Sequence, residues 1–168
     1  MIFTPEHLNS VADGINDLDE AAQEELVDNF AERQPDILAY IMSEDAETLG
    51  DEEAEMLLFV ATIFWQAAER EKGKTMPAVT ADDIDALQDA NWKLFDDNER
   101  PKGMSMSEFV NPIIEAYSEP ELLYFIVDVF EQDEAEADEF AIQEAAQVPM
   151  FVMLKTVADA LIEITKPL

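Results

Sequence analysis

The sequence predicts an all-α protein, and three observations support that fold class. Apolar residues recur three or four positions apart nearly throughout the chain, which is the spacing of one face of a helix. Runs of β-branched residues with strand-like alternation are few, and only 4 Gly occur in 168 residues. The stretch from Met56 to Ala68 is apolar on every side of a helix, and it is too short to span a bilayer, so it indicates a buried central helix.

Start and stop signals predict four helices before residue 75. Each begins at an N-cap residue, a proline or a run of acids, as helix N-termini prefer. Gly73, which follows a basic last turn, ends the longest of them. The four helices are expected over about residues 5–15, 19–33, 35–42 and 51–72.

Four more helices are expected in the second half. Thr80 and Asp83 read as a capping box in which Asp replaces Glu, and Ser105 or Ser107 caps the next helix. Pro112 is expected in the first turn of that helix. The four helices are expected over about residues 80–95, 105–114, 120–130 and 149–162, with an acidic loop at 131–139.

An internal repeat predicts two tandem four-helix units. Gln34–Ile41 matches Glu119–Ile126, with six of the eight pairs identical or conservative, and Thr4 matches Thr80. Units of this kind bury their apolar faces on each other. The alternative is that amphipathic helices resemble one another without duplication.

We therefore expect one all-helical domain over residues 1–168, a helical-repeat-like bundle with halves at about 1–75 and 76–168. The repeat pairs Met56–Ala68 with Pro149–Ile162. The second stretch is less apolar, since Lys155 and Asp159 stand among its core positions. We expect the two helices to occupy equivalent places, with the first more deeply buried.

The charge of the chain restricts its partners. There are 40 acids against 9 bases, a net charge of −31, and the only basic cluster is Arg70, Lys72 and Lys74. Direct binding to nucleic acid or to an anionic membrane is not expected, because both need a basic footprint. A basic protein, cations or a salt-rich solvent fit this charge better.

The residue types needed for most catalytic and metal sites are scarce. The chain has no Cys, and its one His, His7, excludes His-rich zinc and di-iron sites. No glycine-rich phosphate loop occurs, and no cofactor is expected. Asp133–Glu144 and Asp13–Glu24 have the length of an EF-hand loop but lack its ligands and glycine. The remaining candidates for weak cation binding are Asp133, Glu134, Glu136, Asp138 and Glu139.

Three blocks of sequence resemble a family of acidic, all-helical bacterial proteins with no assigned function. The blocks are QPDILAYIMSEDAET, MLLFVATIFW and EPELLYFIVDVFEQD. The resemblance implies a helical fold and no active-site residues. A broader likeness to helical-hairpin arrays of the HEAT type is an analogy of fold only.

These observations favour a non-catalytic module that binds another protein or acts as a scaffold. One alternative is an acidic nucleic-acid mimic that occupies a DNA-binding protein. A second alternative is that the acidity is an adaptation to a salt-rich cytoplasm and serves no partner. A third alternative is an enzyme with an unidentified carboxylate-lined pocket. The chain is also a candidate for a homodimer, because a small domain has few other residues to cover a helix that is apolar on every side. Without a signal-peptide pattern or lipidation motif, the expected location is the cytoplasm.

Overall fold

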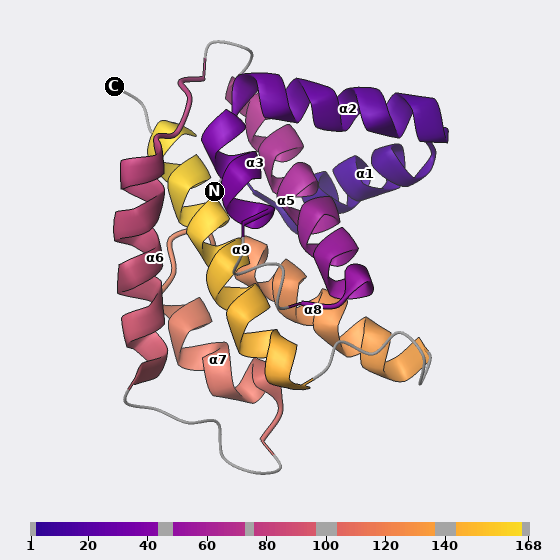
Figure 1. The fold of residues 1–168 in the computed structure, drawn as a ribbon. Coiled ribbons are helices and arrows are strands. Elements are labelled where there is room, and N and C mark those ends of the chain that lie inside the picture. The colour runs from indigo at the N-terminus through magenta and orange to yellow at the C-terminus, as the bar shows by residue number, and fades with distance from the viewer. Residues whose placement is uncertain (1–2, 44–48, 73–75, 97–103, 137–143, 166–168) are drawn as a thin grey trace.

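The computed structural model describes residues 3–43, 49–72, 76–96, 104–136 and 144–165. These residues form eight α-helices and no strand, which confirms the all-α class (Figure 1). None of the described helices is both long and apolar enough to cross a membrane. In chain order the helices are α1 (Pro5–Asn16), α2 (Glu20–Arg33), α3 (Pro35–Ile41), α5 (Asp51–Lys72), α6 (Ala81–Asp96), α7 (Met106–Glu115), α8 (Pro120–Glu136) and α9 (Glu144–Thr165).

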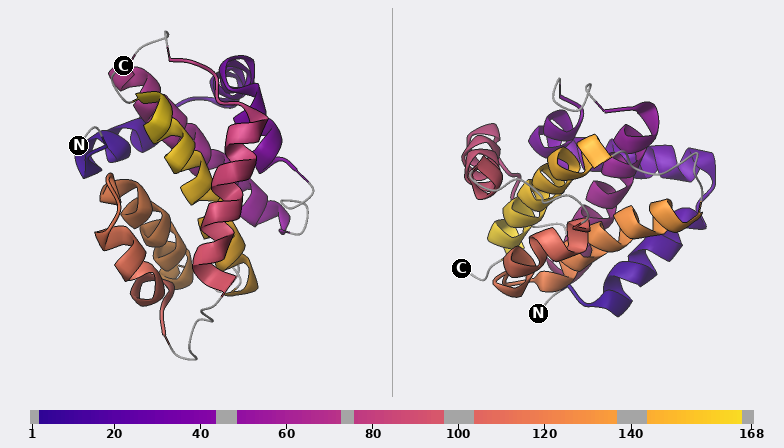
Figure 2. Two further views of the ribbon diagram at one scale, coloured as in Figure 1. Left: turned by 90° about the vertical axis from the view of Figure 1, so that its left-hand side faces the viewer. Right: turned by 90° about the horizontal axis from the view of Figure 1, so that it is seen from below.

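Two 22-residue helices, α5 and α9, pack against each other at the centre of the molecule (Figures 1 and 2). Helices α1 and α2 pack on α5, while α6 and α8 pack on α9. The buried residues of α5 are Leu57, Val60, Ala61, Thr62, Ile63, Phe64, Trp65, Ala67 and Ala68. The prediction of a buried central helix over Met56–Ala68 is therefore confirmed.

Helix α9 is buried even more completely than α5. The run from Met150 to Ala158 is buried without a break, whereas Leu58, Phe59 and Gln66 of α5 are only partly buried. The expectation that the first of the two helices lies deeper is wrong. The reason is that α9 packs extensively on α5, α6 and α8, while α2 makes only a small contact with α5.

N-cap side chains begin four of the helices, and those of α1, α6 and α7 were predicted. In each cap, a side-chain oxygen accepts a hydrogen bond from the backbone N–H three residues later, which satisfies a donor that the helix itself leaves free. The caps are Thr4, Asp19, Thr80 and Ser105, with bond lengths of 3.1, 2.8, 3.2 and 3.2 Å. Ser105, rather than Ser107, is thus the residue that caps α7.

Two helix boundaries and the position of one proline differ from those expected. Pro112 lies in the second turn of α7, and α9 begins at Glu144, so that Pro149 lies inside it. A proline removes one backbone hydrogen bond, and both helices continue past it because their apolar faces are buried on neighbours. Helix α8 continues to Glu136 through part of the expected acidic loop, because Glu, Gln and Ala are good helix formers.

Candidate functional site

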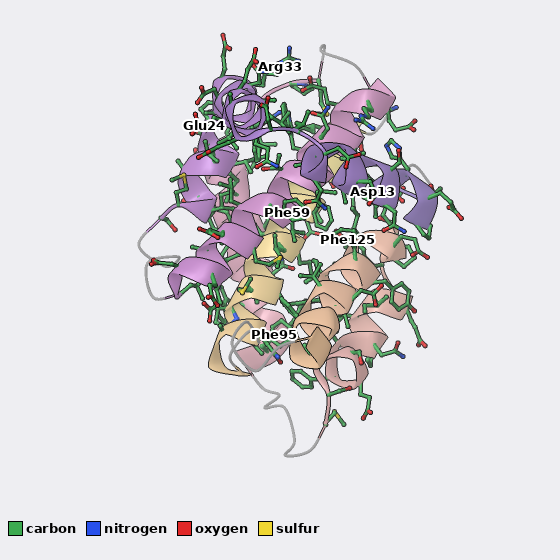
Figure 3. The ribbon with its side chains drawn as sticks, turned by 90° about the vertical axis from the view of Figure 1, so that its right-hand side faces the viewer. Asp13, Glu24, Arg33, Phe59, Phe95 and Phe125 are labelled. Atoms are coloured by element: carbon green, nitrogen blue, oxygen red, sulfur yellow. The ribbon has the colours of Figure 1, made fainter. Side chains whose placement is uncertain are left out.

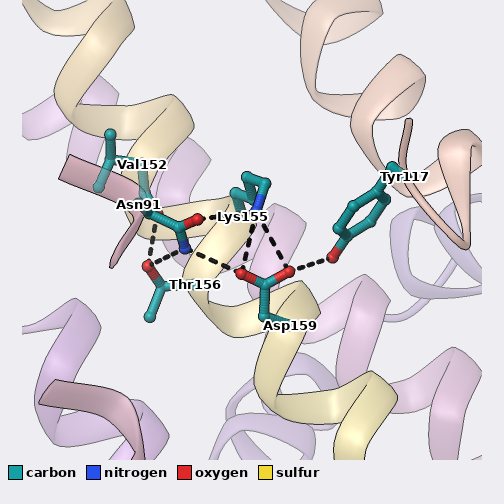
Figure 4. A network of polar contacts seen from close by, with 6 residues as sticks. All are labelled: Asn91, Tyr117, Val152, Lys155, Thr156 and Asp159. Carbon is teal, nitrogen blue, oxygen red and sulfur yellow. Dashed lines mark hydrogen bonds and ion pairs between the residues drawn. The ribbon is translucent and has the colours of Figure 1, made fainter. Parts of the chain in front are cut away.

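Polar side chains meet inside the bundle where α6 lies against α9. Lys155, Thr156 and Asp159 belong to α9, and the four-residue spacing of Lys155 and Asp159 places both on one face. Asn91 reaches them from α6, and Tyr117 reaches them from the connection between α7 and α8 (Figure 4). Asn91 and Thr156 are buried, and the Lys155 and Asp159 side chains are only 10% and 16% exposed. We call these five residues the Lys155 network.

Hydrogen bonds connect α6 to α9 through this network. Lys155 Nζ donates to Asn91 Oδ1 at 2.7 Å and to Asp159 Oδ2 at 3.1 Å. Asn91 Nδ2 donates to Thr156 Oγ1 at 3.0 Å and to Asp159 Oδ2 at 2.9 Å. The Thr156 hydroxyl in turn donates to the Val152 carbonyl oxygen at 2.7 Å. Each member therefore contacts at least one other member (Figure 4).

Tyr117 closes the network from the side of α7 and α8. Its hydroxyl donates to Asp159 Oδ1 at 2.5 Å, and its ring centroid lies 5.0 Å from Lys155 Nζ, within the range of a cation–π contact. Burial raises the pKa of Tyr117 well above its ordinary value, and the negative charge of Asp159 raises it further. The phenol therefore stays protonated and acts as a hydrogen-bond donor.

The polar groups of the Lys155 network form their hydrogen bonds with one another. Asp159 accepts hydrogen bonds from three side chains, and both the oxygen and the nitrogen of the Asn91 amide are engaged. A general acid or base has to reach a substrate atom, whereas these groups face each other. The arrangement is a brace that joins α6, α9 and the α7–α8 connection, and its hydrogen bonds offset the cost of burying two charges.

Sequence reasoning found only part of this network. Lys155 and Asp159 were notable as charges at core positions of an apolar helix. Asn91 carried a similar signal, because it follows Ile84 and Leu87 along the apolar stripe of its helix. Tyr117 carried none, because it lies between two helices and its position depends on how they pack.

The predicted cation candidates do not form a described site. Asp133, Glu134 and Glu136 belong to helix α8, but their side chains lie outside the described residues. Asp138 and Glu139 lie outside the described residues altogether. Within the part of the chain that the structure describes, no group of three or more His, Asp or Glu side chains could hold a metal ion.

His7, Arg70 and Lys72 lie near the last turns of α5. His7 Nε2 is 3.1 Å from the Ala67 carbonyl oxygen and 4.0 Å from Glu71 Oε1. Arg70 and Lys72 are exposed, as expected for cations that complement a helix C-terminus. Lys74 lies outside the described residues. His7 thus contacts a backbone carbonyl oxygen of α5 and lies 4.0 Å from the carboxylate of the exposed Glu71.

Helix α2 presents a row of carboxylates to solvent. Glu20, Glu24, Asp28 and Glu32 follow one another at four-residue intervals, and all four are exposed. Successive members are about 6 Å apart along the helix axis. Phe30 is the only fully buried residue of α2, and the helix lies at the edge of the bundle (Figure 3). We call these four residues the α2 row.

No family model, curated protein or solved structure matches this chain. The resemblance to acidic bacterial proteins is therefore supported only to the extent that the described chain is all-helical.

Proposed function

We propose that this protein is a non-catalytic helical module that binds another protein through its acidic surface. The observation that carries the proposal is the closure of the Lys155 network. These buried charged groups bond to each other, which supports a structural role for them. The groups that a partner meets are exposed carboxylates, which lie on every described helix except α3.

A partner with a basic face fits this surface best. The net charge of −31 attracts a cationic protein over long range and repels nucleic acid and anionic lipid. The α2 row offers a regularly spaced group of exposed acids on a helix that contributes little to the core. Neighbouring acids four residues apart weaken a helix, so the row does not serve the stability of α2.

We also propose that the two tandem units expected from the sequence are equivalent halves of the bundle. Contacts between helices support this pairing. The contact of α1 with α5 is repeated by that of α6 with α9, and the contact of α2 with α3 is repeated by that of α7 with α8. Across the halves, α3 packs on α6 as α8 packs on α1. The pairing is imperfect, since α8 packs on α9 more extensively than α3 packs on α5.

The polar contacts between the halves support the same equivalence. Gln34, just before α3, accepts a hydrogen bond from the Val79 backbone N–H of the second half. Glu119, just before α8, accepts one from the Phe3 backbone N–H of the first half. The repeat pairs Gln34 with Glu119, and the matched Thr4 and Thr80 pair Phe3 with Val79. Two helices that resemble each other without duplication would not be expected to accept hydrogen bonds from matching backbone amides of the opposite half.

A nucleic-acid mimic is the second candidate, and the α2 row favours it. Regularly spaced carboxylates on one helix face could stand in for phosphates. Exposed acids are also distributed widely over the other helices. This distribution favours a generally acidic surface over a single face that mimics nucleic acid. Salt adaptation, homodimerisation and an unidentified carboxylate-lined enzyme pocket stay predictions, which a salt series, light scattering and activity screening would test.

The deciding experiment captures partners on the immobilised chain and then challenges the complex with duplex DNA. A protein-binding module is expected to retain its partner in the presence of DNA and lose it at high salt. Release by DNA at constant ionic strength would favour the mimic instead. If nothing binds at low or at high salt, the interaction proposal is wrong.

Two matched variants locate the binding face. The first neutralises the α2 row with E20Q, E24Q, D28N and E32Q. The second makes the same change in charge on α6, with D82N, D83N, D85N and D89N at exposed positions. Loss of the partner in the first variant alone is the expected result. Equal loss in both would show that total charge, and no particular face, is recognised.

A further inference from the structure

Helix α2 depends on a small set of contacts for its place in the bundle. Phe30 is its only fully buried residue, and half of its 14 residues are exposed. A helix of this length is marginal on its own in water, and acids four residues apart weaken it further. Helix α2 therefore stays helical because of its contacts with α3 and α5.

Two side-chain contacts near the end of α2 hold it on α5. The Phe30 ring stacks on Trp65, with ring centroids 4.9 Å apart and planes inclined by 5°. About one turn further along each helix, Arg33 pairs with Glu69, and their side chains are 32% and 16% exposed. Residues three or four positions apart share a helix face, so both contacts join one face of α2 to one face of α5. We call the Arg33–Glu69 ion pair the α2 latch.

The aromatic contact leaves one polar group unsatisfied. Trp65 is 1% exposed, and its indole N–H has no hydrogen-bond acceptor among the described residues. A buried donor without an acceptor costs free energy, which contact with water returns. Detachment of Phe30 uncovers one face of the indole and lets water reach the N–H. This gain offsets part of the loss of stacking when α2 leaves α5.

The chain on either side of α2 is held independently of these contacts. Before it, α1 packs on α5, and Gln23 Nε2 at the start of α2 donates to the Ile15 carbonyl oxygen at 3.0 Å. After it, Gln34 is 1% exposed and forms hydrogen bonds with Pro77 and Val79 of the second half. A detachment of α2 from α5 is therefore confined to the residues between Gln23 and Gln34.

We infer that this part of α2 detaches from α5 as a separate cooperative unit while the rest of the bundle stays folded, and that the α2 latch controls how often it does so. Local openings of this kind occur where few apolar contacts are buried and many residues are exposed. The opening does not depend on the proposed binding function. One consequence does rest on that function: the α2 row has its regular spacing only while α2 is helical, so the latch also keeps the row ready for a partner.

The test is native-state hydrogen exchange of the full chain, followed by NMR at low urea concentrations. The backbone amides of Val27 and Phe30 are expected to share one protection factor, at least about a hundredfold below that of Phe64 in α5. Urea should change this factor little, because a local opening exposes little surface. The Trp65 indole N–H should follow the same urea dependence. If either the α2 amides or the indole N–H match Phe64 in protection and urea dependence, the inference is wrong.

Two matched arginine variants test the latch. Arg33→Met removes the ion pair, and Arg70→Met makes the same change in charge at an exposed position of α5. Arg33→Met is expected to lower the protection of Val27 and Phe30 by about fivefold, which is the upper range for a partly exposed ion pair. Arg70→Met should leave their protection unchanged. An equal effect of both variants, or no effect of Arg33→Met, would overturn the role of the latch.

A core variant distinguishes local opening from global unfolding. Ile126→Val removes one buried methylene group from α8. It is expected to lower the protection of Phe64 by about fivefold and to leave Val27 and Phe30 unchanged, because the contacts of Ile126 persist while α2 is detached. A parallel fall at Val27 and Phe30 would show that they exchange through global unfolding, which contradicts the inference.

Discussion

Replacing Lys155 with Met is expected to destabilise the protein strongly. Met has a similar volume and an apolar chain, so the substitution removes the charge with little loss of packing. Asp159 would lose its cationic partner, and Asn91 Oδ1 would lose its donor at 2.7 Å. The perturbation therefore leaves one buried charge and one buried carbonyl less well satisfied.

The size of the effect follows from what remains around Asp159. Breaking a buried ion pair costs about 3–5 kcal/mol. Asp159 keeps its hydrogen bonds from Asn91 and Tyr117, so the cost of Lys155→Met is expected at the lower end, about 3 kcal/mol. For a chain of this size, that lowers the melting temperature by roughly 6–12 °C.

Urea unfolding followed by far-ultraviolet circular dichroism measures this cost. The matched variants are Asp159→Asn and the double variant with Lys155→Met. Because the double variant removes both charges, its cost should be smaller than the sum of the single costs by about 1–3 kcal/mol. A cost below about 1 kcal/mol for Lys155→Met, in the range of exposed ion pairs, would refute the role of the network as a buried brace.

Three further predictions follow from the same structure. Because the folded-state pKa of Tyr117 is raised, the protein should lose stability as the pH rises above the ordinary value of 10.0, and Tyr117→Phe should reduce that loss in urea titrations at alkaline pH. Trp65→Ala should cost about 3–5 kcal/mol in the same assay, since Trp65 is buried and stacks on Phe30 with ring centroids 4.9 Å apart; a small cost would contradict tight packing there. Glu24→Gln with Asp28→Asn should raise the melting temperature at low salt, and the gain should vanish at high salt because the repulsion is screened.

Local signals in the sequence predicted most of the helices. Caps such as Thr4 and Thr80 work through bonds to residues three positions later, so a short window of sequence contains the whole interaction. Prolines were less informative. Pro149 marked the start of a helix in the sequence, yet α9 begins at Glu144, because burial of a helix face can outweigh one missing hydrogen bond.

The candidate site was predictable only in part. The sequence marks Lys155 and Asp159 as charges on an apolar helix, but it does not show which groups neutralise them. The exposed acids could not be recognised as a site from their spacing. In a chain with 40 acids, many carboxylates lie one helical turn apart by composition alone. Spacing therefore gave no way to distinguish the α2 row from other acidic faces before the exposure of each residue was known.

The sequence by itself determined the all-α class, the N-caps and the burial of Met56–Ala68, because helical periodicity and capping act over a few residues. Only the tertiary structure decided that α9 lies deepest, that Asn91 meets Lys155 across 64 residues of chain, and that Glu119 holds Phe3. Those contacts depend on how one helix packs against another, and that packing cannot be deduced from the spacing of the residues along the chain.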